Sequence, residues 1–174
     1  MTQMTATVQQ WLESVAGGKT RFALLEILGS IADRYSSCAT SSAGLVIKAG
    51  GSALAKTGSA VTNLVANGIP VAIAASTDMP ALTGINNTAA YYRIVCFFCD
   101  SAGTVTAAAG NEGATLAAAT FPPFPAGKAL VGFLTIYYAS AFTGGTTPLD
   151  TATTTYNSPT GAWDPSVLVG ATSY

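Results

Sequence analysis

The sequence predicts a mainly β protein: a β-sandwich or β-barrel domain preceded by a short N-terminal helical arm. Three observations predict this fold. From Leu45 onward, short runs of β-branched and aromatic residues alternate with turn-forming residues, which is typical of sandwiches and barrels. Before that point, apolar residues recur at spacings of three and four, which indicates amphipathic helix. Charged residues make up only 9% of the chain, against about 25% in ordinary soluble domains. We therefore divide the chain into an arm and linker, residues 1–44, and a β-rich domain, residues 45–174.

The arm is expected to contain two helices. The first begins at a capping box over residues 7–10, where a hydroxyl and an amide each satisfy a free backbone N–H, and it stops at Gly17-Gly18. The second spans residues 20–35, with Phe22, Leu25 and Tyr35 on its apolar side. Two interpretations stay open, because such an arm suits packing on its own domain as well as docking on a neighbouring subunit.

The β-rich domain is expected to contain at least six strands. Segment 59–67 is compatible with helix or strand, and its pattern does not decide between them. A hairpin loop is expected at Asp100–Gly103, because aspartate and glycine supply what a reversing backbone needs, and a second reversal is expected at Asn111–Gly113. The expected strands are Leu45–Ala49, Val71–Ala75, Tyr91–Cys99, Thr104–Ala109, Ala129–Tyr138 and Thr153–Tyr156.

The strand expected at Ala129–Tyr138 is apolar on both sides. Three prolines precede it, and because proline lacks an N–H this approach cannot be a central strand. Simple alternation places one set of side chains on each face, and both faces should be covered. One set is Val131, Phe133, Thr135 and Tyr137; the other is Leu130, Gly132, Leu134, Ile136 and Tyr138.

Charge and composition exclude several classes of function. The net charge is −1 and the basic residues are scattered, so we expect no nucleic-acid partner. The uncharged windows Thr57–Thr77 and Ala129–Leu149 are interrupted by asparagine, glycine, proline or threonine, so we expect no membrane span. The absence of histidine removes the commonest general base and metal ligand. Met1–Gln10 carries no basic signal region, which predicts synthesis in a cytosol with Cys38, Cys96 and Cys99 reduced.

One stretch resembles an enzyme motif. Gly50–Thr57 is similar to a phosphate-binding loop, but Ala55 stands where the second glycine belongs. A nucleotide hydrolase using Lys56, Thr57 and Asp100 is therefore kept only as the least favoured alternative. Cys96 and Cys99 have redox or zinc spacing, yet residues three apart in a strand point to opposite faces. We predict a protein that is not an enzyme, with no catalytic residue, cofactor or metal site.

Aromatic side chains instead suggest association. Three aromatic doublets lie in expected strands, so one ring of each faces either side. A two-sided sandwich core and a subunit interface both remain possible, since tyrosine and phenylalanine are enriched at interfaces. The candidate interface residues are Trp11, Phe22, Leu25, Tyr35, Tyr91, Tyr92, Phe121, Phe124, Tyr137, Tyr138 and Trp163.

Residues 121–150 resemble a segment of tailed-bacteriophage virion proteins. The matching features are Pro123, then Phe124-Pro125-Ala126-Gly127-Lys128-Ala129, then an apolar strand containing one glycine, and then the threonine- and glycine-rich Phe142–Asp150. The segment is similar to one found in head decoration (cement) and head-fibre proteins. This resemblance implies a capsid-stabilising protein on the outer surface of the virion, made in the host cytoplasm. Its implied partners are the major capsid protein and further copies of itself, often as a homotrimer.

An alternative within the same resemblance is a head-fibre or tail-associated protein that presents a receptor-binding surface. In that case Tyr156 and Trp163 in the threonine-rich tail would be exposed.

Overall fold

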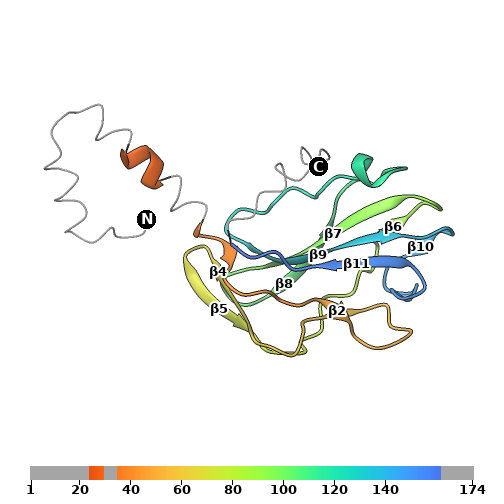
Figure 1. The fold of residues 1–174 in the computed structure, drawn as a ribbon, viewed down its shortest axis with the longest axis horizontal. Coiled ribbons are helices and arrows are strands. Elements are labelled where there is room, and N and C mark those ends of the chain that lie inside the picture. Colours follow the sequence, from red (N-terminus) through yellow and green to blue (C-terminus); the bar gives the residue numbers. More distant parts are fainter. Residues whose placement is uncertain (1–23, 30–34, 162–174) are drawn as a thin grey trace, which may run out of the picture.

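The computed structural model describes residues 24–29 and 35–161 (Figure 1). Residues 24–29 are helical, residues 116–118 form a short 3-10 helix, and most of the remaining described chain forms strands and loops. The predicted mainly β class is confirmed, and so is the short helix near the N-terminus. The sheets of the described residues are arranged like a sandwich, and none of them closes into a barrel. The expected first helix, and with it Trp11, lies outside the described residues, as do Phe22 and Trp163. No helix among the described residues is long and apolar enough to cross a membrane.

Four antiparallel strands form the main sheet, in the order β11–β9–β7–β8. They are β7 (Tyr92–Cys99), β8 (Val105–Ala109), β9 (Ala129–Tyr137) and β11 (Thr153–Asn157). Each matches a predicted strand to within one residue at either end. The hairpin loop predicted at Asp100–Gly103 is confirmed: Asp100 and Thr104 pair through their backbones, and Gly103 has a φ of 85°.

A second sheet, called here the side sheet, has the order β1–β4–β5. Its strands are β1 (Cys38–Ala39), β4 (Thr62–Ala66) and β5 (Ile69–Ile73), so the undecided segment 59–67 contains a strand. Asn67 and Gly68 connect β4 to β5 with φ values of 51° and 76°, the mirror-image turn that favours tight hairpins. The predicted strand Val71–Ala75 is therefore wrong by two residues at each end. Pro70 is tolerated within β5 because β5 is an edge strand.

Two small sheets complete the architecture. β2 (Val46–Ile47) pairs with β3 (Ala55–Lys56), and β6 (Asn86–Asn87) pairs with β10 (Phe142–Thr143). The strand predicted over residues 45–49 is thus shorter than expected. Two-residue strands cannot be predicted from the sequence, because they are too short to show an alternating pattern.

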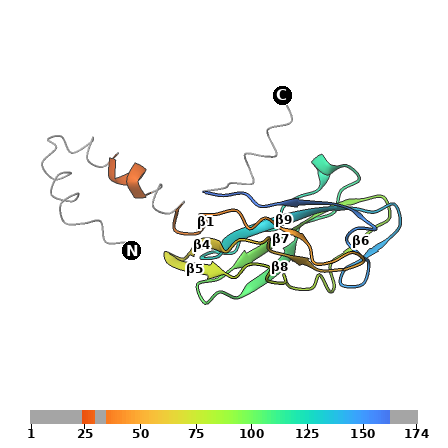
Figure 2. The same ribbon diagram turned by 60° about the horizontal axis from the view of Figure 1, so that its bottom comes forward.

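The main core, called here the first core, lies between the two larger sheets. Figures 1 and 2 show β4 and β5 lying along the main sheet, with β1 beside β4. The sheets meet through fully or nearly fully buried side chains. From the side sheet these include Leu64, Ala66 and Ile73, and from the main sheet Val95, Phe97, Cys99, Val131, Leu134 and Ile136.

A second core lies on the opposite face of the main sheet. Ile94, Cys96, Phe98, Ala119 and Leu130 form it, and residues 110–125 cross over this face. That segment contains the 3-10 helix η1 (Leu116–Ala118). The doublet Phe97-Phe98 therefore belongs to a two-sided core within one chain, since its rings are 1% and 0% exposed.

A β-bulge in β9 overturns the predicted alternation of faces. Phe97 pairs with Gly132 but Phe98 pairs with Leu130, so Val131 is an extra residue. Val131 therefore joins Leu134 in the first core, whereas Leu130 packs in the second core. Beyond an extra residue in a strand, side chains that would have pointed to one face point to the other. A prediction based on strict alternation does not include such a residue.

The reversal predicted at Asn111–Gly113 is also wrong. Gly113 exchanges two backbone hydrogen bonds with Tyr92, of 2.8 and 2.9 Å, so the chain is still following β7 there. The chain turns afterwards at η1 and returns, with the Thr120 N–H donating to the Asn111 carbonyl at 3.1 Å. Glycine is needed at position 110 because the returning chain passes very close to it: a Cβ placed on Gly110 would lie 1.7 Å from the Thr120 carbonyl oxygen.

Candidate interaction surfaces

The outer face of the β4–β5 hairpin carries no charged side chain. In this hairpin every second residue points to the first core, and the others point outward. No residue between Lys56 and Asp78 is charged. An antiparallel sheet normally alternates to polar residues on its solvent side. Here that side is apolar except for one asparagine; it consists of Val61, Asn63, Val65, Pro70, Ala72 and Ala74 and is called the outer hairpin face.

The outer hairpin face is accessible. Val61 is 50% exposed, and Pro70, Ala72 and Ala74 are exposed as well. In both views β5 lies at the margin of the fold (Figures 1 and 2). Ile69, beside the Asn67-Gly68 turn, adds another half-exposed apolar side chain at the hairpin tip. Contiguous exposed apolar patches on a protein surface mark interaction sites. The outer hairpin face is therefore a candidate interaction surface.

The free edge of β5 extends this surface. β5 pairs with β4 on one side, and no other strand of the described residues pairs with it on the other. Pro70 blunts the edge, because a proline in an edge strand removes one hydrogen-bond donor. The residues on either side of Pro70 still have backbone N–H and C=O groups along this edge. Another chain can pair with an edge strand through such groups.

Four of the predicted interface residues gather over the second face of the main sheet, where they pack in pairs. Tyr92 and Tyr137 lie with ring centroids 4.7 Å apart. Phe121 packs edge-on against Phe133 at 5.1 Å, and Phe124 packs edge-on against Phe98 at 5.0 Å. Such aromatic pairs stabilise the fold of the single chain. Tyr92, Phe121 and Tyr137 are only half-buried, so part of each ring still faces outward.

The other predicted interface residues do not join that group. Tyr91 is exposed next to Tyr92, whereas Tyr138 packs against the first core. Leu25 lies half-buried in the helical residues 24–29, and Tyr35 is 57% exposed at the start of the linker. Tyr156, which the receptor-binding alternative expected to be exposed, is half-buried and packs against the first core.

Sequence analysis missed the outer hairpin face. None of its residues is among the predicted interface residues, which are all aromatic except Leu25. Two signals were available in the sequence: the uncharged stretch from Thr57 to Thr77, and the Asn67-Gly68 pair, which is the strongest short-range signal for a hairpin. Combined, they place an uncharged hairpin on the surface.

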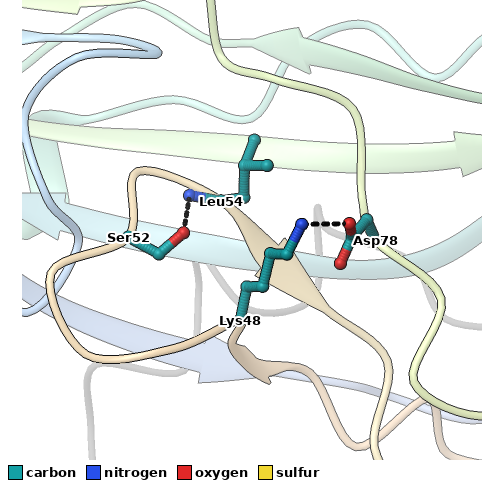
Figure 3. A network of polar contacts seen from close by, with 4 residues as sticks. All are labelled: Lys48, Ser52, Leu54 and Asp78. Carbon is teal, nitrogen blue, oxygen red and sulfur yellow. Dashed lines mark hydrogen bonds and ion pairs between the residues drawn. The ribbon is translucent and has the colours of Figure 1, made fainter.

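The stretch that resembles a phosphate-binding loop folds as a β-hairpin. Ser52 N–H bonds to the Ala49 carbonyl, and β3 then returns along β2, so no helix follows the loop. Figure 3 shows the Ser52 hydroxyl accepting a hydrogen bond from Leu54 N–H, and Lys48 paired with Asp78. A phosphate-binding loop needs free N–H groups at the start of a helix, and here a strand follows the loop instead.

Three residues of the motif and of the predicted site, Gly51, Thr57 and Asp100, are already engaged in hydrogen bonds within the fold. The Asp150 carboxylate accepts a hydrogen bond from Gly51 N–H at 2.7 Å, where a phosphate would have to compete with a negative charge. The Thr57 hydroxyl is buried; it donates to the Ala74 carbonyl and accepts from Thr77 N–H. Asp100 lies in a different hairpin and accepts from the N–H groups of Ala102 and Thr104.

The three cysteines are free and buried. Cys96 lies in the second core and Cys99 in the first, so the predicted orientation to opposite faces is confirmed. Burial raises the pKa of Cys96 to about 12, and burial also raises the pKa of Cys38 and Cys99. A thiol with a raised pKa is a poor nucleophile, because the thiolate is the reactive form. Within the described residues, no group of three or more potential metal ligands comes together.

Comparison of the chain with protein-family models, with curated proteins and with solved structures found no match.

Proposed function

We propose that this protein is a structural component of a tailed-phage particle, a decoration or cement protein that binds the major capsid shell as an oligomer. The observation that carries the proposal is the outer hairpin face, an exposed and uncharged sheet surface beside a free strand edge. The resemblance of residues 121–150 to phage decoration and head-fibre proteins supplies the biological setting.

The low charge of the whole chain supports the same proposal. Fifteen ionisable Lys, Arg, Asp and Glu side chains serve 174 residues, and the outer hairpin face has none of them. Burial of apolar surface contributes about 25 cal/mol per Å². A modest contact repeated over many copies can therefore stabilise a shell. Such a protein acts through binding area and needs no reaction centre.

The first experiment measures self-association. Size-exclusion chromatography with light scattering gives the mass of the purified chain, and we expect an oligomer. Ala72→Glu places a charge in the middle of the outer hairpin face, where the exposed side chain of residue 72 has no role in the core. We expect this variant to shift toward the monomer while its thermal unfolding stays unchanged.

Ala139→Glu is the matched control, because it adds the same charge at an exposed alanine outside that face. The control variant should retain the oligomer. A wild-type chain that is monomeric at all accessible concentrations, and that also fails to bind expanded shells assembled from a candidate major capsid protein, would remove the proposal. Binding to shells is measured by co-sedimentation, with Ala72→Glu again as the impaired variant.

A further inference from the structure

The backbone groups on the free edge of β5 can be assigned from the neighbouring strand. Asn63, on β4, donates its N–H to the Ser41 hydroxyl at 2.7 Å, and its carbonyl accepts from the Thr40 N–H at 2.9 Å. Both partners lie on the β1 side of β4, so the backbone groups of Asn63 face away from β5. Antiparallel strands alternate between bonded and non-bonded pairs, and Ala72 is the register partner of Asn63. The N–H and C=O of Ala72 therefore point away from β4, to the free edge.

Pro70 and Ala74 share this edge with Ala72, because residues two apart in a strand direct their backbone groups to the same side. Pro70 contributes only its carbonyl, since proline has no N–H. Ala74 follows the end of β5, and its N–H lies trans to the preceding carbonyl, which points to β4. The Ala74 carbonyl already accepts from the hydroxyls of Thr57, at 3.1 Å, and Thr77, at 2.7 Å. The edge thus offers two donors, on Ala72 and Ala74, and two acceptors, on Pro70 and Ala72.

This pattern is complementary to itself about a two-fold axis at Ala72. When Ala72 lies opposite Ala72 of a second copy, the two residues exchange both of their backbone hydrogen bonds. Pro70 of each copy then faces Ala74 of the other, and the Ala74 N–H donates to the Pro70 carbonyl. The N–H that Pro70 lacks falls opposite the Ala74 carbonyl, which is already satisfied within its own chain. Every open group of both edges is paired.

The neighbouring registers leave groups unpaired. With Pro70 opposite Ala72, the Ala72 carbonyl faces a residue that has no N–H. With Ala72 opposite Ala74, the Ala72 N–H faces a carbonyl that is already occupied. A backbone group left without a partner in a closed sheet is costly, so Pro70 selects the register centred on Ala72.

Charge and side-chain size also allow two copies to approach. No residue between Lys56 and Asp78 is charged, so pairing of the two edges opposes no like charges. Ala72 and Ala74 are small and exposed, and β5 lies at the margin of the fold (Figures 1 and 2). Charged side chains commonly protect a free edge from such pairing, and β5 has none.

We propose that β5 pairs antiparallel with β5 of a second copy of this chain, with Ala72 opposite Ala72. The side sheets of the two copies then form one continuous sheet. This inference rests on the self-association in the proposed function and specifies its contact. Because both copies use the same surface, the contact closes with two copies.

Cysteine cross-linking tests the register on the full chain. Paired residues of this kind have Cα atoms about 5.5 Å apart, within the range of a disulfide. Ala72→Cys should therefore give a disulfide-linked dimer on mild oxidation. Ala74→Cys is the matched control, because position 74 is also an exposed alanine but would lie about 14 Å along the strand from its copy. We expect Ala72→Cys to cross-link at least about tenfold faster; equal rates, or a faster Ala74→Cys, would overturn the inference. The unchanged chain, whose three cysteines are buried, gives the background.

Hydrogen exchange gives a second readout without substitution. The Ala72 amide should exchange several-fold more slowly at concentrations where the chain is dimeric than after dilution to the monomer. The Val71 amide is the internal control, because it points to β4 in either state. Ala72 exchange that does not depend on concentration would contradict the pairing. Protection that appears only when capsid shells are added would overturn it too, because the edge would then dock on the shell protein.

These results separate this inference from the proposed function. A chain that forms oligomers, or binds shells, without selective Ala72→Cys cross-linking overturns the β5 pairing and leaves the proposed function in place. A chain that stays monomeric and binds no shell removes both.

Discussion

Thr57 shows how one side chain can resemble a ligand-binding residue and serve the fold instead. Its hydroxyl is fully buried and links the Ala74 carbonyl, at 3.1 Å, to the Thr77 N–H, at 2.9 Å. These bonds hold the chain that leaves β5 against the chain that leaves β3. A motif comparison registers the residue type and its spacing, but it does not register that the hydroxyl is already used.

Thr57→Val should therefore destabilise the protein. Valine has nearly the same shape but leaves the Thr77 N–H without its hydroxyl acceptor, which costs about 1–3 kcal/mol. The free energy of unfolding in urea measures the loss. Thr57→Ser keeps the hydroxyl and should lose about 1 kcal/mol, the value of one buried methyl group. A larger loss for serine than for valine would mean that packing, and not hydrogen bonding, explains this threonine.

Hydrogen bonds from Thr88 lower the pKa of the Glu112 carboxyl group. The Thr88 hydroxyl and the Thr88 N–H both donate to its carboxylate, at 2.5 and 2.8 Å, and the charge of Arg93 adds to the effect. These partners favour the charged form, so the folded-state pKa lies below the ordinary value for glutamate.

This pKa predicts how the contact responds to acid. Because the folded-state pKa of Glu112 is depressed, its contact with Thr88 stabilises the folded state fully above the unfolded-state pKa. This stabilisation is lost as the pH falls through the folded-state pKa. NMR titration of the Glu112 carboxyl carbon should give a midpoint below that of a model glutamate, and the Thr88 amide should titrate with it. In Glu112→Gln the Thr88 amide transition should disappear. A Glu112 midpoint at or above the model value would contradict the contact.

At the scale of elements, the β4–β5 hairpin depends on its two-residue turn. Asn67 and Gly68 both have positive φ, and such a turn matches the natural twist of the strands. The turn also contacts the linker before β1, because Gly68 N–H donates to the Ser36 carbonyl at 2.7 Å. The outer hairpin face thus depends on local turn chemistry as well as on packing.

Gly68→Ala isolates the conformational part of this dependence. A Cβ at Gly68 would meet no atom within 4 Å, so only the positive φ of 76° opposes the substitution. The left-handed conformation costs an L-residue about 1–2 kcal/mol, and the unfolding free energy should fall by that amount. Gly50→Ala serves as control, since a Cβ there lies 4.0 Å from Asp150 and the residue has no left-handed φ. Equal losses at the two glycines would show that φ is not the cause.

The bulge in β9 decides how the side chains of this strand are divided between the two cores. It sends Val131 to the first core and Leu130 to the second, which lets one strand supply both cores with large side chains. Residues 110–125 can then cover the second face closely, because Gly110 and Gly113 admit the returning backbone. The main sheet is thereby buried on both faces within one chain over much of its area.

At the scale of the whole molecule, this arrangement leaves the outer hairpin face of the side sheet exposed. The second face of the main sheet is covered by residues 110–125, whereas the outer hairpin face has no cover among the described residues. Association through that face would be driven by burial of apolar area and by pairing at the β5 edge.

Association of this kind should respond weakly to ordinary salt. Screening acts on charged groups, and the Debye length falls from about 10 Å at 0.1 M to 3 Å at 1 M. Sedimentation equilibrium should therefore give nearly the same dissociation constant for the oligomer in low and high sodium chloride. Sulfate should strengthen association, because it is excluded from apolar surface. A dissociation constant that rises steeply with sodium chloride would point to ion pairs and to a different surface.

Features with a local cause were predictable from the sequence. The hairpin at Asp100–Gly103 follows from turn chemistry, and the four strands of the main sheet follow from runs of β-forming residues long enough to show a pattern. The orientation of Cys96 and Cys99 to opposite faces follows from the geometry of a strand. The scarcity of charge is a direct property of composition, and it is compatible either with a surface of small uncharged residues or with a surface buried against other chains.

The tertiary structure decided which surface that is. Whether Asn111–Gly113 turns the chain or lets it pass close to residues 118–120 depends on contacts between segments, and the same holds for the bulge at Val131. The aromatic doublets show the reason. A ring in a strand is apolar whatever covers it, and only the packing of residues 110–125 over one sheet, with nothing described over the other, separates core from exposed face. Periodicity along a chain records which side a residue faces, while the identity of what lies on that side is set by residues far away in sequence.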